Sequence, residues 1–475
     1  MADALWQWDD LVRAAGGVAD DAPAEAITGF ALDTRALKAG EVFVALVDQR
    51  DGHAFVPAAF KSGAPAALVA SGYQRQPGDG ALIRVDDTLR GLERIGAAAR
   101  ARLAAEARVI AVTGSAGKTG TKEMLRACLS RLGPTHAPEK SFNNHWGVPL
   151  TLARMPASTR YGVFEIGMNH AGEITPLTKL VRPHVAIVTN VLPVHVGNFP
   201  DGEIGVAKAK AEIFCGLTPG GTAVILADSP HADLLRAAAD AAGARVVAFG
   251  RDETSDVRLT SLEIGAGAQQ ETTRIAARIG SSGREFDFVL GMVGRHLATN
   301  ALAVVAALEA LGCQLALALP GLAAVHAPVG RGERHLLAAG DGVVLLIDES
   351  YNANPASMGA ALATLAQVSD GRVTRKLAVM GDMLELGDGA GDYHKGLQPQ
   401  AERADLVFAC GPNMKLLYDS LSPVRRGHWT PTASELSGYV LAALRPGDVV
   451  MVKGSLGSRM APIVAAIKAR FASAA

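Results

Sequence analysis

Short apolar runs rich in β-branched residues recur along the chain, and polar loops or helical stretches separate one run from the next. Runs of this kind are typical of strands buried in parallel sheets. They lie at residues 109–112, 161–166, 185–189, 343–347, 377–380, 406–410 and 449–452. Because they alternate with helical crossovers, we expect doubly wound parallel sheets in the central and C-terminal parts of the chain.

Two regions depart from this pattern. Near the N-terminus, residues 43–46 and 66–69 are strand candidates with a helix between them at 55–61, which indicates a small α/β domain. Between residues 257 and 290, apolar and polar positions alternate, which favours a small antiparallel subdomain. The patterns together predict an α/β protein of three domains: a small N-terminal α/β domain at 1–84, a central doubly wound phosphate-loop domain at 85–327 and a Rossmann-like domain at 328–475.

Composition narrows the function classes. The chain has 46 basic and 47 acidic residues. It therefore lacks the excess of positive charge that is typical of proteins that bind nucleic acid or an anionic membrane. Residues 297–319 are almost wholly apolar, but Asn300, Glu309 and Gly312 interrupt them, and we expect a buried helix instead of a membrane span. The N-terminus is acidic and lacks a secretory signal, and the four cysteines lie far apart without a CxxC pair. We therefore expect a cytoplasmic protein with reduced thiols.

A glycine-rich loop joins the run at 109–112 to a helical stretch that ends before Gly133-Pro134. Strand, loop and helix N-terminus form a phosphate cradle, because backbone N–H groups and the helix dipole point at the anion. Lys118 would add a charge on the terminal phosphates, and Thr119 a hydroxyl ligand for magnesium. The predicted nucleotide-binding residues are Gly114, Ser115, Ala116, Gly117, Lys118 and Thr119. The general pattern spaces its two glycines further apart than Gly114 and Gly117, so a glycine-rich turn without a ligand is the alternative.

Polar side chains follow the central strands, where parallel sheets bind their ligands. Glu165 stands at the end of one strand beside the phosphate loop, which is the position of a magnesium ligand. The next strand leads into His195, and the following helix carries Lys208 and Lys210. These two lysines cannot share a face of the helix. A solvated lysine at Lys210 and a core or loop histidine at His195 are the alternatives to functional roles.

Seven motifs occur in a fixed order: TGSAGKT, FEIGMNHAGEI, AKAKAEIF, GRH…N, DESYNANP, GDMLELG and VKGS. On these motifs nearly the whole chain resembles the Mur ligases, the ATP-dependent amide ligases of peptidoglycan precursor synthesis. The N-terminal LDTR and DGHAF resemble the uridine-nucleotide-binding domain of that family. YNANP together with FEIGMNHAGEI resembles the members that join D-alanyl-D-alanine to UDP-N-acetylmuramoyl-tripeptide.

The resemblance implies a mechanism and two magnesium sites. A substrate carboxylate would attack the γ-phosphate of ATP, and the amine of D-alanyl-D-alanine would then attack the resulting acyl phosphate. Lys118, Glu165, His195 and Lys210 would be catalytic; Thr119 and Glu165 would hold one Mg²⁺, and His195 and Lys210 the second. A lysine ammonium cannot ligate a cation, and in this family the corresponding lysine is often carbamylated, which turns it into a carboxylate.

The resemblance also implies nucleotide and substrate contacts from all three domains. Asn300, with His296 nearby, would reach the adenine or ribose, while Arg331, Asp348 and Tyr351 would close on the nucleotide from the C-terminal domain. The implied substrate-binding residues are Thr34, Arg35, Asp51, Gly52, His53, Asn143, Asn144, Asn169, Asn352, Lys453 and Ser455. For His296 and Tyr351 a packing role is the alternative, and asparagines after strands also cap turns. We expect a monomer that acts without nucleic acid or membrane insertion.

Three other functions stay open at this level. A sister ligase that adds a diamino acid would need a DNPR-type motif where YNANP stands. A folylpolyglutamate synthetase shares the loop but usually lacks the N-terminal uridine domain. A nucleotide-gated binding protein that has lost its chemistry would not be expected to keep Lys118, Glu165, His195 and Lys210.

Overall fold

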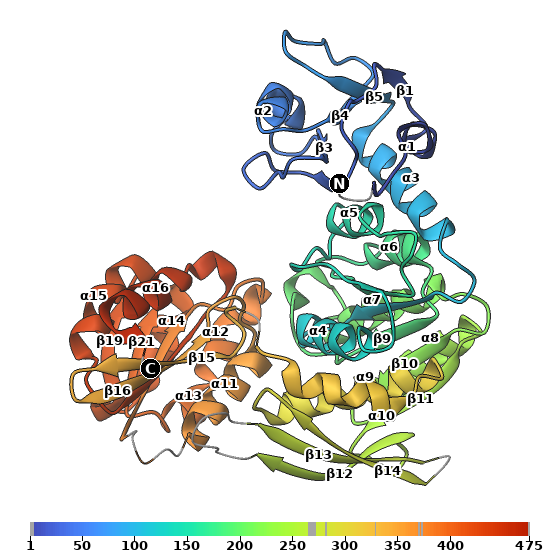
Figure 1. The fold of residues 1–475 in the computed structure, drawn as a ribbon. Coiled ribbons are helices and arrows are strands. Elements are labelled where there is room, and N and C mark those ends of the chain that lie inside the picture. The colour runs from blue at the N-terminus through green and yellow to red at the C-terminus, as the bar shows by residue number, and fades with distance from the viewer. Residues whose placement is uncertain are drawn as a thin grey trace.

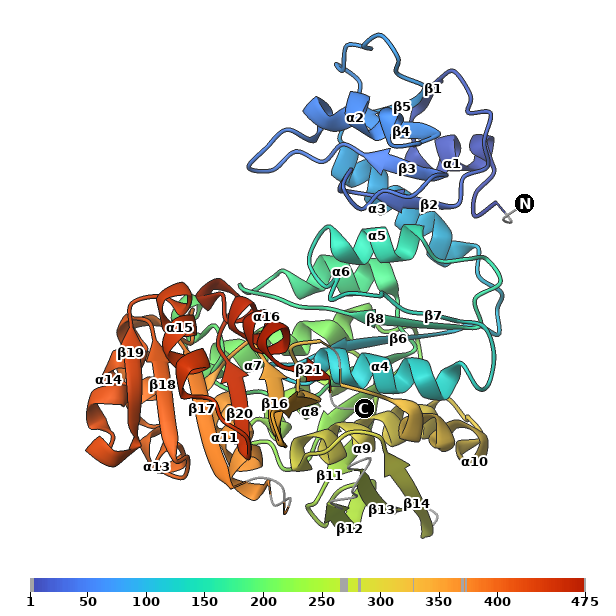
Figure 2. The same ribbon diagram turned by 60° about the vertical axis from the view of Figure 1, so that its left-hand side comes forward.

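The computed structural model describes residues 4–264, 272–280, 283–327, 329–368, 371 and 374–473. Within them the chain forms three sheets, each flanked by helices (Figure 1). The N-terminal sheet, in blue, lies beyond one end of the central green and yellow part, and the C-terminal sheet, in orange and red, lies beside the central part (Figure 2). Mixed α/β structure with three sheets confirms the predicted fold class.

The N-terminal sheet has the strand order β1-β5-β4-β3-β2, with β1 antiparallel and the other pairs parallel. Its strands are β1 (Val18–Asp20), β2 (Gly29–Ala31), β3 (Glu41–Val44), β4 (Ala66–Ala70) and β5 (Ala81–Val85). Its helices are α1 (Trp8–Ala15), α2 (Val56–Lys61) and α3 (Thr88–Ala101). Leu92 and Ile95 of α3 share a buried cluster with Leu150 from the central part of the chain, so α3 joins the two regions.

The central sheet carries the predicted phosphate loop and runs in the order β14-β13-β12-β11-β10-β9-β6-β8-β7. Its strands are β6 (Arg108–Thr113), β7 (Thr135–His136), β8 (Tyr161–Glu165), β9 (Val185–Val188), β10 (Thr222–Leu226), β11 (Arg245–Gly250), β12 (Val257–Ile264), β13 (Thr273–Ile279) and β14 (Arg284–Leu290). Its helices are α4 (Lys118–Leu129), α5 (Gly147–Ala153), α6 (Ile174–Val181), α7 (Glu203–Ala211), α8 (Ala232–Ala241), α9 (Arg295–Ala310) and α10 (Leu315–Ala318).

Alternation along each strand divides the central core into two faces. Ile110 and Val112 of β6 pack with α4, α9 and α10, whereas Val109 and Ala111 pack with α5, α6, α7 and α8. This two-sided burial explains why the strands read as continuous apolar runs. Because β6, β8 and β9 are parallel neighbours, their carboxyl ends lie at the same edge of the sheet.

Two central elements differ from the sequence expectation. The strands β12, β13 and β14 are antiparallel as predicted, but they extend the central sheet through the parallel β11–β12 pair instead of forming a separate sheet. Residues 265–271 and 281–282 of that region lie outside the described part of the chain. The apolar stretch predicted as one helix over 297–319 ends its first helix at Ala310, because Gly312 takes a left-handed conformation at φ +68°.

The C-terminal sheet has the order β19-β18-β17-β20-β16-β15-β21 and is parallel except at β15. Its strands are β15 (Glu333–Ala339), β16 (Gly342–Glu349), β17 (Arg375–Gly381), β18 (Leu406–Cys410), β19 (Arg426–Thr430), β20 (Asp448–Lys453) and β21 (Ala472–Ser473). Its helices are α11 (Pro355–Gln367), α12 (Ala390–Lys395), α13 (Gln398–Ala401), α14 (Pro412–Ser420), α15 (Ala433–Ala443) and α16 (Ala461–Arg470). Strands β15 and β19 were not predicted, because their half-buried positions leave no apolar run.

Candidate active site

The loop between β6 and α4 has the shape of a phosphate cradle. Gly114 and Gly117 hold φ angles of +148° and +83°, a region that favours glycine. A Cβ atom at Gly114 would collide with the Thr189 hydroxyl, and one at Gly117 with the Asn300 side chain. Glycine is therefore required at both positions, and Asn300, buried on α9, lies directly against the loop.

The loop that follows β9 holds the phosphate loop in place. The backbone N–H of Ala116 donates to Asn190 Oδ1 at 2.9 Å, and Thr189 Oγ1 donates to the Ala116 carbonyl at 2.6 Å. Ser115 Oγ donates to the Leu192 carbonyl at 3.1 Å. These bonds preform the cradle, and Asn190 and Thr189 were not among the predicted site residues.

Lys118 begins α4 and folds back over the loop. Its Nζ donates to the Gly114 carbonyl at 2.7 Å. Burial lowers the pKa of Lys118, Glu165 acts in the opposite direction, and the charge of Arg331 lowers it further. Arg331 comes from the C-terminal part of the chain, so cations from two domains face the loop.

A carboxylate and two hydroxyls meet beside the loop. Thr119 Oγ1 donates to Glu165 Oε2 at 3.0 Å and lies 3.1 Å from Ser141 Oγ. Asn143 Nδ2 donates to Glu165 Oε1 at 2.7 Å. Hydroxyl and carboxylate oxygens are the ligands that Mg²⁺ accepts, so Thr119 and Glu165 fit a magnesium site. Ser141 was missing from the predicted set, although its neighbour Asn143 was in it.

Lys210 and His195 lie near each other and form a second group of basic side chains beside the site. Lys210 is 3% exposed on α7, whereas Lys208 points to solvent and pairs with Asp201 at 2.8 Å. Burial lowers the pKa of Lys210 well below its usual range, and the charge of Lys118 lowers it further. Burial also lowers the pKa of His195, against the opposing charge of Glu385.

No group of three or more His, Cys, Asp or Glu side chains among the described residues is arranged to hold a metal ion. A metal at either position would therefore need other donors. At Thr119 and Glu165 these are a hydroxyl and the phosphates of a bound nucleotide. At Lys210 an ammonium group repels a cation, whereas a carbamate on the same nitrogen would supply oxygen ligands.

The C-terminal domain reaches the phosphate loop through Arg331. Its guanidinium lies 3.5 Å from Ser141 Oγ and 4.2 Å from the centre of the Tyr351 ring. Asp348 is buried, and its Oδ1 accepts from the backbone N–H and the hydroxyl of Ser350. Arg331 and Tyr351 are thus brought together, while Oδ1 of Asp348 is hydrogen-bonded within its own turn.

Lys453 and Ser455 tie the ends of β20 and β16 together. Lys453 Nζ donates to Glu349 Oε2 at 3.1 Å and to the Asn352 carbonyl at 2.9 Å. Ser455 Oγ accepts from the Leu384 N–H at 3.0 Å. Both side chains are buried, so they organise this edge of the C-terminal sheet, and the exposed Asn352 stands beside them.

Two predicted asparagines, Asn144 and Asn169, are exposed and make local contacts. Asn144 is exposed, and its Oδ1 accepts from the backbone N–H groups of Trp146 and Gly147 at the start of α5. Asn169 is exposed, and its backbone N–H donates to Glu173 Oε2 at 2.8 Å. The capping alternative describes Asn144, whose amide serves the turn.

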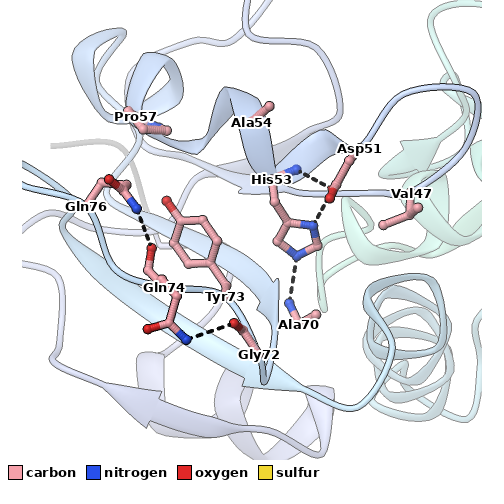
Figure 3. Close-up of a pocket in the computed structure, with 10 residues that line it drawn as sticks. All are labelled: Val47, Asp51, His53, Ala54, Pro57, Ala70, Gly72, Tyr73, Gln74 and Gln76. Carbon is pink, nitrogen blue, oxygen red and sulfur yellow. Dashed lines mark hydrogen bonds and ion pairs between the residues drawn. The ribbon is translucent and has the colours of Figure 1, made fainter.

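The predicted uridine-binding residues divide into two groups. Thr34 and Arg35 lie on an outer turn, where Arg35 pairs with Asp33 at 2.6 Å and its hydrogen bonds lower the pKa of Asp33 to about 2. Asp51 and His53 instead line a cavity of about 730 Å³, shown in Figure 3. Gly52 lies between them, and its close packing on the Leu46 backbone leaves no room for a side chain.

The His53 ring is held at both nitrogens. Its Nδ1 lies 2.6 Å from Asp51 Oδ1, and its Nε2 accepts from the Ala70 N–H at 2.9 Å (Figure 3). Tyr73 lies 5.7 Å from the imidazole, centre to centre. The cavity also takes its walls from Gln74 and Gln76, which the sequence patterns did not indicate because they lie in a polar loop.

No helix among the described residues is long and apolar enough to cross a membrane.

A phosphate loop in one domain, faced by an arginine from the next, defines a multidomain enzyme that acts on nucleotide phosphates. Profiles described as Mur ligase middle domain and as Mur ligase, glutamate ligase domain match residues 112–308 and 330–456. The UDP-N-acetylmuramoyl-tripeptide–D-alanyl-D-alanine ligase of Bacillus subtilis is 34% identical over 445 residues, which cover 92% of each chain. The protein belongs to the Mur ligase family, and it is a ligase.

Two further relatives bear the same name or its short form. The UDP-N-acetylmuramoyl-tripeptide–D-alanyl-D-alanine ligase of Escherichia coli is 36% identical over 443 residues and 92% of each chain. The crystal structure of MurF from Acinetobacter baumannii is similar with a TM-score of 0.82 and 31% identity, covering 97% of this chain and 98% of that one.

Proposed function

We propose that this protein joins D-alanyl-D-alanine to UDP-N-acetylmuramoyl-tripeptide at the expense of ATP, which gives a pentapeptide precursor of peptidoglycan. The observation that carries the proposal is that Lys118 of the phosphate loop and Arg331 of the C-terminal part of the chain both lie close to the Thr119–Glu165 pair. The names of the relatives, each similar over most of its length, support the same reaction.

Two covalent steps account for the reaction. In the first, an oxygen of the tripeptide carboxylate bonds to the γ-phosphorus of ATP, and the bond to the β-phosphate oxygen breaks to release ADP. In the second, the dipeptide amine bonds to the acyl carbon, phosphate leaves and the amine loses a proton. Two anions approach each other in the first step, which is why cation density at the loop matters most.

Each side chain at the loop has a part in that first step. The backbone amides of the loop and Lys118 would hold the β- and γ-phosphates. Thr119 and Glu165 would hold one Mg²⁺, and His195 and a carbamylated Lys210 a second. Magnesium would neutralise the charge that builds up on the transferred phosphoryl group. Arg331 would stabilise the same charge from the C-terminal side, and Tyr351 beside it would face the nucleotide.

The surroundings of Lys210 support the proposed carbamylation. A neutral amine attacks CO₂, forms a carbon–nitrogen bond and releases a proton. Burial and the charge of Lys118 lower the pKa of Lys210, and a lowered pKa favours the neutral amine. The product is an anion between cations, where it is stabilised.

The three domains divide the substrates between them in this proposal. Residues 1–84 would bind the uridine nucleotide in the cavity lined by His53 and Tyr73, whose volume is within the usual range of small-molecule sites. Residues 85–327 would bind ATP, and residues 328–475 would close on it and present the dipeptide beside Asn352 and Lys453. Position 328 itself lies outside the described residues. Four free cysteines favour a reducing compartment such as the cytoplasm, and we propose a monomer.

Isotope transfer tests the acyl-phosphate step. With heavy oxygen in the tripeptide carboxylate, one label is expected in the phosphate released per turnover, because the attacking oxygen leaves with phosphorus. Mass spectrometry of the phosphate provides the measurement, and unlabelled substrate is the control. Unlabelled phosphate released at the normal rate of product formation would show that the carboxylate never attacked phosphorus.

A further inference from the structure

Glu385, the glutamate of the GDMLELG motif, is an acidic side chain beside the site to which the proposed function gives no part. It lies in the segment between β17 and the short helix Gly387–Gly389 of the C-terminal domain. Its Oε2 lies 2.5 Å from Nδ1 of His195, which belongs to the central domain. The contact therefore joins a side chain of one domain to a proposed metal ligand of another.

The backbone on both sides of this contact is held in an uncommon conformation. His195 and Glu385 have φ angles of +60° and +62°, in the left-handed region that residues other than glycine seldom occupy. Such conformations persist where the surrounding structure enforces them, and they gather at functional sites. Next to the pair, Gly197 and Gly387 pack so closely that a Cβ on Gly197 would lie 2.9 Å from the Gly387 Cα.

The Glu385 loop is fixed from within its own domain. Met383 and Leu386 are buried on either side of the glutamate, and the Leu384 N–H donates to Ser455 Oγ at 3.0 Å. The carboxylate itself remains half exposed, at 53% for the side chain. Because the loop is anchored on both sides of Glu385, it can hold the projecting carboxylate in a fixed position against His195 of the neighbouring domain.

His195 needs such a group. Its Nδ1 is shielded from solvent and, among the described residues, has no aligned hydrogen bond; Glu385 is its ion-pair partner. A histidine that ligates a metal through one nitrogen carries its proton on the other, and that N–H is nearly always donated to a carboxylate, a carbonyl or water.

We propose that Glu385 is a positioning residue for His195, which it holds with Nε2 directed toward the second magnesium position. This rests on the proposed function, in which His195 is a ligand of that metal. The carboxylate comes from the C-terminal domain, so the ligand is fully oriented only when that domain lies against the central one. Contact between the domains thereby completes the metal site.

The test compares full-length Glu385→Ala and Glu385→Gln with the wild type and with Asp388→Asn. Asp388 is an exposed carboxylate on the same loop, three residues away, and serves as the matched control. Mn²⁺ replaces Mg²⁺ as the probe, and a non-hydrolysable ATP analogue fills the loop. Pulsed electron paramagnetic resonance then reports a histidine nitrogen on the bound ion, and His195→Ala supplies the spectrum without it.

Glu385→Ala is expected to lose the nitrogen signal, to bind the second Mn²⁺ about 10–100-fold more weakly and to lose kcat by a similar factor. The KM for ATP should stay near the wild-type value, because the phosphate loop is untouched. Glu385→Gln, which keeps the length of the side chain, should show a smaller loss and provides the result if the alanine variant does not fold. Wild-type kcat and an unchanged nitrogen signal in Glu385→Ala would overturn the proposal. A wild-type enzyme that shows the signal but forms no amide product would refute the proposed ligase reaction and leave the role of Glu385 supported.

Discussion

Lys210→Ala is expected to lower kcat by about 10²–10³-fold, the range seen when one group that stabilises transition-state charge is removed. The reason is specific: Lys210 is buried, and burial with the nearby Lys118 lowers its pKa toward the neutral amine that carbamylation requires. Acetate or formate at high concentration should restore part of the activity, because either anion can occupy the space of the missing carbamate. Steady-state assays with and without the added carboxylate provide the measurement.

Lys208→Ala is the matched control for this experiment. Lys208 lies on the same helix, but its side chain is 60% exposed and pairs with Asp201. An exposed pair of this kind contributes little, so near-wild-type activity is expected. Full activity in Lys210→Ala, or no rescue by any small carboxylate, would contradict a carbamate at this position.

Glu165→Gln is expected to reduce kcat by a similar factor, about 10²–10³-fold, and to raise the Mg²⁺ concentration needed for half-maximal rate. The substitution removes one negative charge between Thr119 and Asn143 while the loop amides and Lys118 keep their places. ATP should therefore still bind, with little change in its Kd. Magnesium titrations of the rate, together with nucleotide binding by calorimetry, separate the two effects.

Glu263→Gln is the control for Glu165→Gln. Glu263 is an exposed glutamate on β12, and its amide variant should keep the wild-type magnesium requirement. A Glu165→Gln enzyme with the wild-type requirement would show that this carboxylate holds no metal.

The sequence predicted the parts of the site that follow from local geometry. Glu165 could be placed beside the phosphate loop because strands β6 and β8 are parallel neighbours and end at one edge. Lys210 could be separated from Lys208 because helical periodicity sends residues two apart to different faces. The loop glycines could be placed because strand, loop and helix form one continuous stretch of chain.

Contacts between residues of different domains could not be predicted from the sequence. Nothing local to Glu385 indicates that it lies against His195, since the pairing requires two domains to be in contact. The turn at Asp348 was also not evident from the sequence: Ser350, two residues later, donates to Asp348 Oδ1, and the contact of Asp348 with the nucleotide stays a prediction. The buried helix expected within 297–319 is present as α9 but ends at Ala310, because Gly312 takes a left-handed φ within the long apolar pattern.

Product analysis tests the central claim most directly. The full-length protein is incubated with ATP, Mg²⁺, D-alanyl-D-alanine and UDP-N-acetylmuramoyl-tripeptide that carries either diaminopimelate or lysine at the third position. Mass spectrometry should show a product heavier than the tripeptide substrate by the dipeptide less one water, with one ADP and one phosphate formed for each product molecule. ATP consumed without incorporation of the dipeptide would contradict the account. So would the addition of a single diamino acid in a parallel incubation that offers UDP-N-acetylmuramoyl-dipeptide and the diamino acid instead.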